Sequence, residues 1–336
     1  GTVVAGIPTA GAARVGDEIA LLPHGERGRI KRIQVYGRDS DAVKAGQCAA
    51  LNVGHWEPER IGRGDVVTLP GYFAADSWWA ASLRLLPHEK LLLKNGAAVK
   101  FHTGTSEVNA NLFSVEGLPL EGGTERLVQL RLERPVVAGP GDPFIVRTLS
   151  PVRTVGGGTL LEATPGKIKK HRPEAAALLR ERAAALGDDA RFVEHCLRRA
   201  ASLAATSAEL AAAGKVLPGR LQAILAQLVA AGRAAALSAS LYAHAVTIAE
   251  AGGRILATLR EHHRQTPESP GLAVEQLRPV AGMDNAVLDG MLAALKAAGT
   301  LAERGGRWAA PEHRPQLQEA DSKWVDAVEA TFRAQE

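Results

Sequence analysis

The strongest constraint on the fold is a repeat in the second half of the chain. The segments LQAILAQLVAAGRAA, starting at Leu221, and LDGMLAALKAAGTLA, starting at Leu288, align without gaps. In both copies leucines recur at three- and four-residue steps, which is the spacing of an amphipathic helix, and a glycine ends the run. A shorter apolar helix precedes each copy, and a strand-like pair follows it. The repeat therefore predicts two helix-turn-helix units, each followed by a hairpin, which is the organisation of a winged helix.

The first half of the chain has a different period. From Gly1 to about Ala163, short runs rich in Val, Ile, Leu and Thr are separated by Gly and Pro. In LVQLRLE (127–133), apolar side chains at 128, 130 and 132 alternate with polar ones at 129, 131 and 133, as in a half-buried strand. Many short strands with few helical intervals favour antiparallel barrels over a parallel sheet. The predicted fold class is a multi-domain chain with two antiparallel β-barrels followed by mainly α winged-helix repeats.

These patterns give the domain boundaries. We expect β-barrels at 1–72 and 73–165, winged helices at 166–247 and 248–314, and the start of a truncated third winged helix at 315–336. The last segment places Trp324, Val325, Val328 and Phe332 on one helical face. Each winged-helix unit is small enough that one core barely supports a fold, so we expect neighbouring modules to pack on each other.

The glycine run TVGGGTLLEA (154–163) is the one feature that suggests a phosphate-binding loop. A P-loop requires a glycine five residues before its Gly-Lys pair and Ser or Thr after it; here Leu161 precedes Gly166-Lys167 and Ile168 follows. We therefore interpret the run as a turn between two strands, where glycines permit positive φ and a close approach of strands.

Independent catalysis and metal binding have no support in the sequence. The histidines form no HExxH pair, no G-x-S-x-G elbow is present, and the two cysteines, Cys48 and Cys196, form no CxxC motif. We expect no enzyme activity, no cofactor and no metal in this chain. Two distant cysteines, with no long apolar run and no signal-like N-terminus, predict a cytoplasmic protein without a membrane partner. We also expect a monomer. The net charge of +4 is compatible with a nucleic-acid partner.

Several segments together resemble a known family. GTVVAGIPTAGAARVGDEIALLP, AVKAGQCAALNV, IGRGDVV, VKFHTGTSEVNANL and GDPFIVRTLSPVRTVGGGTLLEA are similar to the second and third barrel domains of translational GTPases. The continuation into tandem winged helices resembles the bacterial selenocysteine-specific elongation factors. The resemblance implies GTP-dependent delivery of selenocysteinyl-tRNA to the ribosome at UGA codons. It also implies that the barrels hold the aminoacyl end and the tRNA stem, and that the last winged helices bind an mRNA hairpin.

The sequence departs from this family in three places. It opens at the GTVV strand, without a GTPase domain, so GTP and magnesium are expected only in a complete family protein. Cys48 stands where the family tends to carry an arginine, a cation suited to a selenolate, and a thiol cannot form that ion pair. Only two complete winged helices are present, so hairpin binding by this chain is not expected.

The candidate contacts to aminoacyl-tRNA combine exposed cations with the motifs of the resemblance. Arg29 and Lys31 lie on a basic strand whose exposed face suits phosphates, with a solvated face as the alternative. His102 and Thr105 flank a tight turn at Gly104 that contacts RNA or holds the barrel together. The complete set is Arg29, Lys31, Cys48, Arg63, His102, Thr105, Arg147 and Arg153.

The helical half offers a second set of cations. A nucleic-acid face there could use Arg198, Arg199, Arg220, Arg260, His262, His263 and Arg264, but aromatic residues for base stacking make up only 4% of the chain. We therefore interpret the winged helices mainly as spacers. Two alternatives stay open: a winged-helix DNA-binding regulator with a barrel sensor domain, and a Tu-type factor with another cargo.

Overall fold

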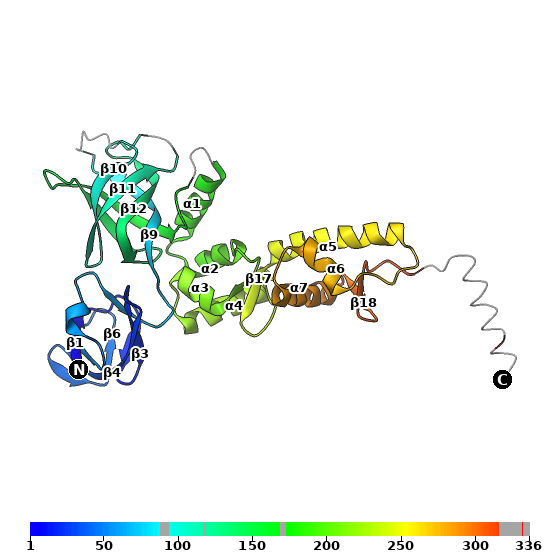
Figure 1. Cartoon of the computed structure of the whole chain (residues 1–336), viewed down its shortest axis with the longest axis horizontal. Coiled ribbons are helices and arrows are strands. Elements are labelled where there is room, and N and C mark those ends of the chain that lie inside the picture. The colour runs from blue at the N-terminus through cyan, green and yellow to red at the C-terminus, as the bar shows by residue number, and fades with distance from the viewer. Residues whose placement is uncertain (88–93, 117–118, 169–172, 316–330, 332–336) are drawn as a thin grey trace. The chain divides into compact units, whose positions relative to one another are not determined.

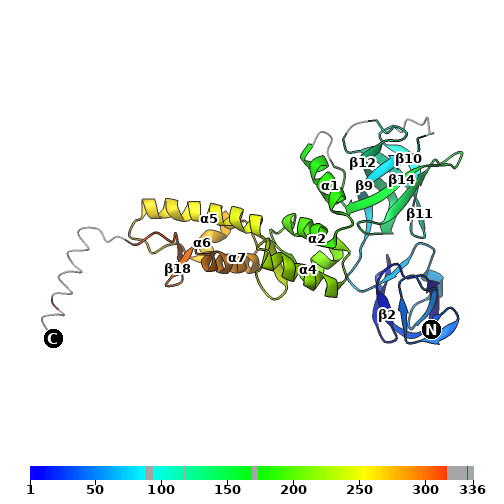
Figure 2. The same cartoon turned by 180° about the vertical axis from the view of Figure 1, so that it is seen from behind.

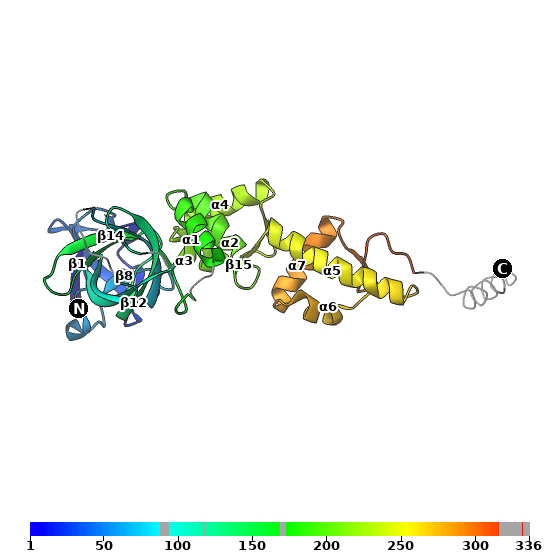
Figure 3. The ribbon, with the colours of Figure 1, turned by 90° about the horizontal axis from the view of Figure 1, so that it is seen from above.

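The computed structural model describes residues 1–87, 94–116, 119–168, 173–315 and 331 (Figures 1 to 3). The chain divides into two compact units. Unit 1 comprises residues 1–195 and 208–221, and unit 2 comprises residues 196–207 and 222–336. The expected third winged helix at 315–336 lies outside the described residues, apart from Pro315 and Thr331.

The first domain of unit 1, which we call the first barrel, combines a six-stranded antiparallel sheet with a small strand pair. The sheet follows the order β1-β7-β4-β3-β8, β5 pairs with β4, and β2 pairs with β6. Val43 of β6 packs in the same core as Ile30 and Ile33 of β4, so the strand pair belongs to this core. The strands are β1 (Thr2–Gly6), β2 (Ala12–Arg14), β3 (Glu18–Leu22), β4 (Glu26–Val35), β5 (Arg38–Ser40), β6 (Ala42–Lys44), β7 (Ala49–Val53) and β8 (Val66–Thr68), with a 3-10 turn at Pro58–Arg60.

The second domain of unit 1 is a closed barrel with the strand order β10-β11-β12-β9-β14-β13. Pairing of β13 with β10 closes it. Phe101 and Phe144 stack inside it with ring centroids 5.5 Å apart. The strands are β9 (Ala75–Leu85), β10 (Ala97–Thr103), β11 (Ser106–Ser114), β12 (Glu125–Val137), β13 (Pro143–Arg147) and β14 (Thr154–Ala163).

The glycine run lies inside a strand, which corrects the expectation of a turn. Gly156, Gly157 and Gly158 belong to β14, and none of them has a positive φ. A Cβ on Gly156 would lie 2.6 Å from the carbonyl oxygen of Arg84, and one on Gly158 would overlap that of Ser82. Only the close approach of strands is therefore confirmed, and this packing leaves no room for a phosphate group.

The polar face of β12 is also partly buried, which the alternation did not predict. Gln129 is 1% exposed, because the chain after β14 lies against it. Its amide donates to Thr164 Oγ1 at 2.8 Å and to the carbonyl of Gly166 at 2.9 Å, and its Oε1 accepts from the N–H of Ile168 at 2.7 Å. The segment that follows β14, up to Ile168, is therefore docked on the barrel.

Helix α1 (Pro173–Ala185) lies against the outer wall of the closed barrel (Figure 1). Ala176 and Leu179 of this helix pack on Leu127 and Leu161 of the barrel. The side chain of Arg182, in the same helix, is also buried. Its Nε donates to the carbonyl of Leu161 at 2.7 Å, its Nη1 lies 3.2 Å from Glu162, and its guanidinium covers the ring of Phe192.

The remaining elements follow the repeat. Helices α3 (Ser207–Gly214) and α4 (Pro218–Ala230) precede β16 (Ala234–Ala236) and β17 (Leu241–His244), which pair with each other. Helices α6 (Val274–Ala281) and α7 (Asn285–Ala297) precede the hairpin of β18 (Ala302–Arg304) and β19 (Arg307–Ala309). The other elements are α2 (Asp189–Arg198), β15 (Ala205–Thr206) and α5 (Ala245–Gln265), a long helix that Figure 3 shows beside α7.

The leucines of the repeat form the cores. Leu221, Leu225 and Leu228 are buried in α4, and Leu288, Leu292 and Leu295 are buried in α7. In α7 they pack against Ile255 and Leu259 of α5. The predicted fold class, antiparallel barrels followed by mainly helical winged-helix repeats, is confirmed. Among the described residues, no helix is both long and apolar enough to cross a bilayer.

Candidate nucleic-acid interface

The predicted residues of the first barrel lie on its surface. Arg29 and Lys31 are exposed on β4, and neither side chain forms an ion pair within the described part of the chain. Cys48 is exposed just before β7, and its carbonyl accepts the N–H of Tyr36 at 3.0 Å. Tyr36 is 68% exposed in the turn after β4. The surface around Cys48 therefore carries an aromatic ring and a thiol.

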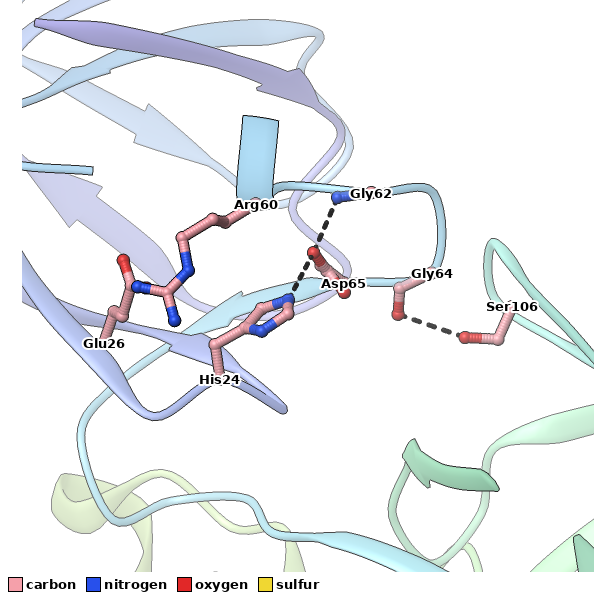
Figure 4. Close-up of polar contacts among 7 residues, drawn as sticks. All are labelled: His24, Glu26, Arg60, Gly62, Gly64, Asp65 and Ser106. Carbon is pink, nitrogen blue, oxygen red and sulfur yellow. Dashed lines mark hydrogen bonds and ion pairs between the residues drawn. The ribbon is translucent and has the colours of Figure 1, made fainter. Parts of the chain in front are cut away.

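Arg63 and Thr105 lie where the two barrels meet. The Nε of Arg63 donates to the carbonyl of Thr105 at 3.3 Å. Beside it, the hydroxyl of Ser106 donates to the carbonyl of Gly64 at 3.1 Å, and Ser106 is 5% exposed (Figure 4). Both residues were predicted as candidate RNA contacts, with a structural role as the alternative for the turn that carries Thr105, and each has a partner in the other barrel.

The turn that carries Arg63 is held by Asp65. The Oδ2 atom of Asp65 accepts the N–H of Gly62 at 2.8 Å and lies 3.1 Å from Nε2 of His24 (Figure 4). Arg60 precedes this turn and forms an ion pair with Glu26 at 3.0 Å. The turn is therefore fixed to the first barrel at several points.

A group of cations surrounds Glu107 on the outer wall of the closed barrel. We name Lys100, His102, Arg134 and Arg147 the cation cluster, in which His102 carries charge only when it is protonated. Lys100 Nζ lies 2.7 Å from Glu107 Oε1, His102 Nδ1 lies 3.8 Å from its Oε2, and Arg134 donates to its backbone carbonyl at 3.1 Å. Arg147 stands opposite Lys100 in the pairing of β13 with β10.

The cation cluster retains positive charge. A hydrogen bond from Lys100, together with the charges of Lys100, His102 and Arg147, holds the pKa of Glu107 below its usual value. One carboxylate therefore faces several cations. The Nε2 of His102 and the Nε of Arg147 are also buried, and neither has a hydrogen-bond partner within the described residues. The net positive charge of this surface attracts a polyanion such as an RNA backbone.

Arg153 lies in the loop between β13 and β14. The N–H of Thr148 donates to the carbonyl of Arg153 at 2.9 Å, and the N–H of Arg153 donates to Thr148 Oγ1 at 3.1 Å. These bonds close the loop while the Arg153 side chain stays exposed. Leu149 and Val152 of the loop are 42% and 44% exposed.

The cations of the helical half are mostly engaged with carboxylates. Arg260 Nε lies 2.7 Å from Glu312, Arg264 pairs with Glu261, and Arg220 lies 3.6 Å from Asp189. His263 is 8% exposed, so it does not belong to a surface face. Arg198 and Arg199 are exposed. This pattern supports the interpretation of the winged helices as spacers.

The second helix of each helix-turn-helix presents few groups that could read bases. On α4 the exposed positions include Gln222, Ala223, Ala226 and Gln227. On α7 the exposed basic residue Lys296 forms an ion pair with Glu303 at 2.7 Å. Of the arginine, asparagine and glutamine residues that usually read base edges, α4 carries only Arg220, Gln222 and Gln227, and α7 carries only Asn285.

Sequence reasoning missed a cavity of about 550 Å³ in unit 1, between the closed barrel and the turn from α1 to α2. Its charged lining is largely bonded internally, because Lys215 pairs with Asp142 and Glu125 accepts from Ser82. Asp188 accepts the N–H of Arg191 at 3.1 Å. No local sequence pattern could have predicted this cavity, because its lining comes from segments far apart in the chain.

Comparison with known families matches both halves of the chain. The profile described as "Selenocysteine-specific elongation factor, beta-barrel domain" matches residues 81–167. The profile described as "Elongation factor SelB, winged helix" matches residues 256–309, which include α6, α7, β18 and β19. The first match covers most of the closed barrel and the second covers the second copy of the repeat.

Comparison with curated proteins gives related matches. A selenocysteine-specific elongation factor of Desulfomicrobium baculatum is 33% identical over 178 residues, which are 53% of this chain and 28% of that protein. That of Escherichia coli (strain K12) is 24% identical over 99% of this chain and 51% of its own length. Elongation factor Tu 2 of Streptomyces avermitilis is 26% identical over 48% of this chain and 42% of its own. The chain thus spans about half or less of the length of these relatives.

Proposed function

We propose that the chain, which matches a selenocysteine-specific elongation factor profile at residues 81–167 and a winged-helix profile at residues 256–309, is the tRNA-binding and spacer part of such a factor. In this proposal the barrels hold selenocysteinyl-tRNA during its delivery to the ribosome at UGA codons in the cytoplasm. GTP and magnesium are bound elsewhere in the complete factor, because no segment of this chain fits a phosphate-binding loop. The mRNA hairpin is likewise a partner of the complete factor.

The observation that carries the proposal is the cation cluster of the closed barrel. Lys100, Arg134 and Arg147 outnumber the single carboxylate of Glu107 that they surround. Phosphate oxygens of an RNA stem supply acceptors of the required charge. Arg153 extends the same positive surface at the β13–β14 loop, and Arg29 and Lys31 contribute exposed cations from the first barrel.

Salt-dependent binding tests this function. We expect selenocysteinyl-tRNA to bind the chain when the GTPase domain and GTP are added in trans, with an affinity that falls as salt rises. Each phosphate contacted contributes on the order of −0.7 to −0.9 to the slope of log affinity against log salt. Absence of salt-dependent binding under these conditions contradicts the proposal. Specific binding of a DNA duplex instead would favour a regulator.

A Tu-type factor with another cargo is the second candidate. Cys48 favours it, because an exposed thiol beside Tyr36 offers no cation to a selenolate. The match to elongation factor Tu 2 is compatible with it, although that match covers only 48% of this chain. The same tRNA carrying serine in place of selenocysteine distinguishes the two: a preference for the selenocysteinyl form supports the first candidate, and equal binding supports the second.

A further inference from the structure

We propose that the contact between Gly64 and Ser106 is a joint that aligns the two barrels, so that Arg63 and the cation cluster bind one continuous RNA backbone. The inference rests on the proposed function and assigns a different role to part of the predicted site. Gly64, Ser106 and the Thr105 carbonyl are positioning groups. Arg63, fixed through its Nε, presents the rest of its guanidinium at the hairpin that carries the cluster.

Two features exclude a side chain at Gly64: its backbone conformation and the close approach of the second barrel. Its φ of +103° lies in the region that side chains rarely adopt. A Cβ at this position would also lie 2.9 Å from the hydroxyl oxygen of Ser106 and 3.4 Å from its Cα. Any side chain at residue 64 would therefore push the β10–β11 turn away from the first barrel.

The first barrel holds its side of the joint firmly. Asp65, whose side chain is 13% exposed, accepts the N–H of Gly62 and lies beside His24 (Figure 4). These bonds fix the turn at 62–65 before it reaches Ser106. Because this turn is held in place, a substitution at Gly64 is expected to displace the second barrel rather than the turn itself.

The second barrel connects the joint directly to the cation cluster. Ser106 begins β11 and pairs with Thr103, and the next pair in the same ladder is Glu107 with His102. Lys100 follows two residues further along β10 and binds Glu107. A displacement of the turn at Ser106 therefore moves the carboxylate around which the cluster is built.

Two matched glycine substitutions test the joint. Gly64→Ala and Gly16→Ala impose a similar backbone strain, because Gly16 has a φ of +95°, but a Cβ on Gly16 meets nothing within 4 Å. We expect Gly64→Ala in the full chain to weaken tRNA binding about tenfold and to make the salt slope shallower by about one phosphate. Gly16→Ala should retain the wild-type affinity and slope.

The slope separates positioning from simple destabilisation, since loss of folded protein lowers the bound fraction without changing the number of phosphates contacted. Ser106→Ala, which removes the hydrogen bond but leaves the approach open, should weaken binding by a smaller factor. Wild-type affinity and slope in Gly64→Ala, or an equal loss in Gly16→Ala, overturns the inference.

NMR relaxation distinguishes failure of the joint from failure of the proposed function. We expect the barrels of the wild-type chain to tumble as one body and those of Gly64→Ala to tumble separately. If the wild-type barrels already tumble independently, the inferred joint between Gly64 and Ser106 is refuted, whether or not the chain binds tRNA. If they tumble together but wild-type protein binds no tRNA, the proposed function fails, and the inferred RNA surface fails with it.

Discussion

The barrels and the second winged helix use their cations differently. On the closed barrel, Lys100, Arg134 and Arg147 gather around the single carboxylate of Glu107. In the second winged helix, Arg260, Arg264 and Lys296 each face a carboxylate. The same residue types therefore give an excess of positive charge on the closed barrel and one-to-one surface ion pairs in the second winged helix. Basic residues in a sequence therefore do not by themselves locate a nucleic-acid site.

The largest expected effect concerns a cation that folding buries. Arg182→Met removes the bonds of Arg182 to the Leu161 carbonyl and to Glu162, and leaves both without that partner. We expect a loss of about 3 kcal/mol in the free energy of unfolding, because the buried carbonyl of Leu161 loses a charged hydrogen-bond donor and the half-buried Glu162 loses its partner. Urea unfolding followed by tryptophan fluorescence measures it.

Arg27→Met in the first barrel is the control. The Arg27 side chain is 70% exposed and pairs with Glu18, whose side chain is 52% exposed. Its removal should cost less than about 1 kcal/mol, as for most exposed pairs. Equal losses in the two variants would show that burial does not separate these arginines, and the contrast between regions would then need another cause.

The second prediction concerns acid stability of the second winged helix. Burial, together with the charges of His313 and His262, lowers the pKa of His263 to about 4, while Glu312 opposes this and Arg304 adds to it. The unfolded chain takes up a proton near pH 6.5 that the folded chain binds only near pH 4. Stability is therefore fully present above about pH 6.5 and falls as the pH drops to about 4, by at most about 3 kcal/mol.

His263→Phe tests this dependence, because it keeps a ring beside His313 and removes the titrating group. The variant also loses the acceptor for the N–H of Ala310, so its stability at neutral pH is expected to be lower. The decisive quantity is the slope of stability against pH between about 4 and 6.5, which should be shallower than in the wild type. An unchanged slope would show that titratable groups other than His263 cause the loss of stability in acid.

The sequence predicted best where local periodicity decides the structure. The repeated leucines at 221 and 288 form buried helical cores because a spacing of three and four residues defines one helix face. The alternation in 127–133 predicted the strand but not the burial of Gln129, because a segment more than 30 residues later covers its polar face. The glycine run was misassigned because its cause, the crowding of Gly158 against Ser82, lies in another strand.

The candidate site shows the same limit. His102 and Arg147 lie close together because β10 pairs with β13. The sequence motifs predicted the barrel but not this pairing. Arg63 and Thr105 are 42 residues apart and bind each other across two domains. No local pattern reports such a contact. Residue type therefore identified which groups have suitable chemistry, and only the tertiary structure separated those open to a ligand from those that hold the protein together.

The third prediction compares the regions directly in RNA binding. Arg147→Glu reverses a charge in the cation cluster and places a second carboxylate near Glu107, so we expect about tenfold weaker binding of tRNA. Arg260→Glu makes the same change in the second winged helix and should alter binding less than twofold. Filter binding at fixed salt measures both, and circular dichroism checks that each variant is folded. Equal losses would contradict the assignment of the winged helices as spacers.

The smallest expected effect concerns the ion pair of Arg260 with Glu312. Both side chains are more than half exposed, at 59% and 54%, so water solvates each charge almost as well as its partner does. Arg260→Gln, Glu312→Gln and the double variant should each change the free energy of unfolding by less than about 0.5 kcal/mol, and the coupling in the double-mutant cycle should be equally small. A coupling above about 1 kcal/mol would show that these pairs hold the segment after β19 in place. Arg260 would then stabilise the fold much as Arg182 does. The barrels and the winged helix would differ in the partners of their cations and not in the strength of those interactions.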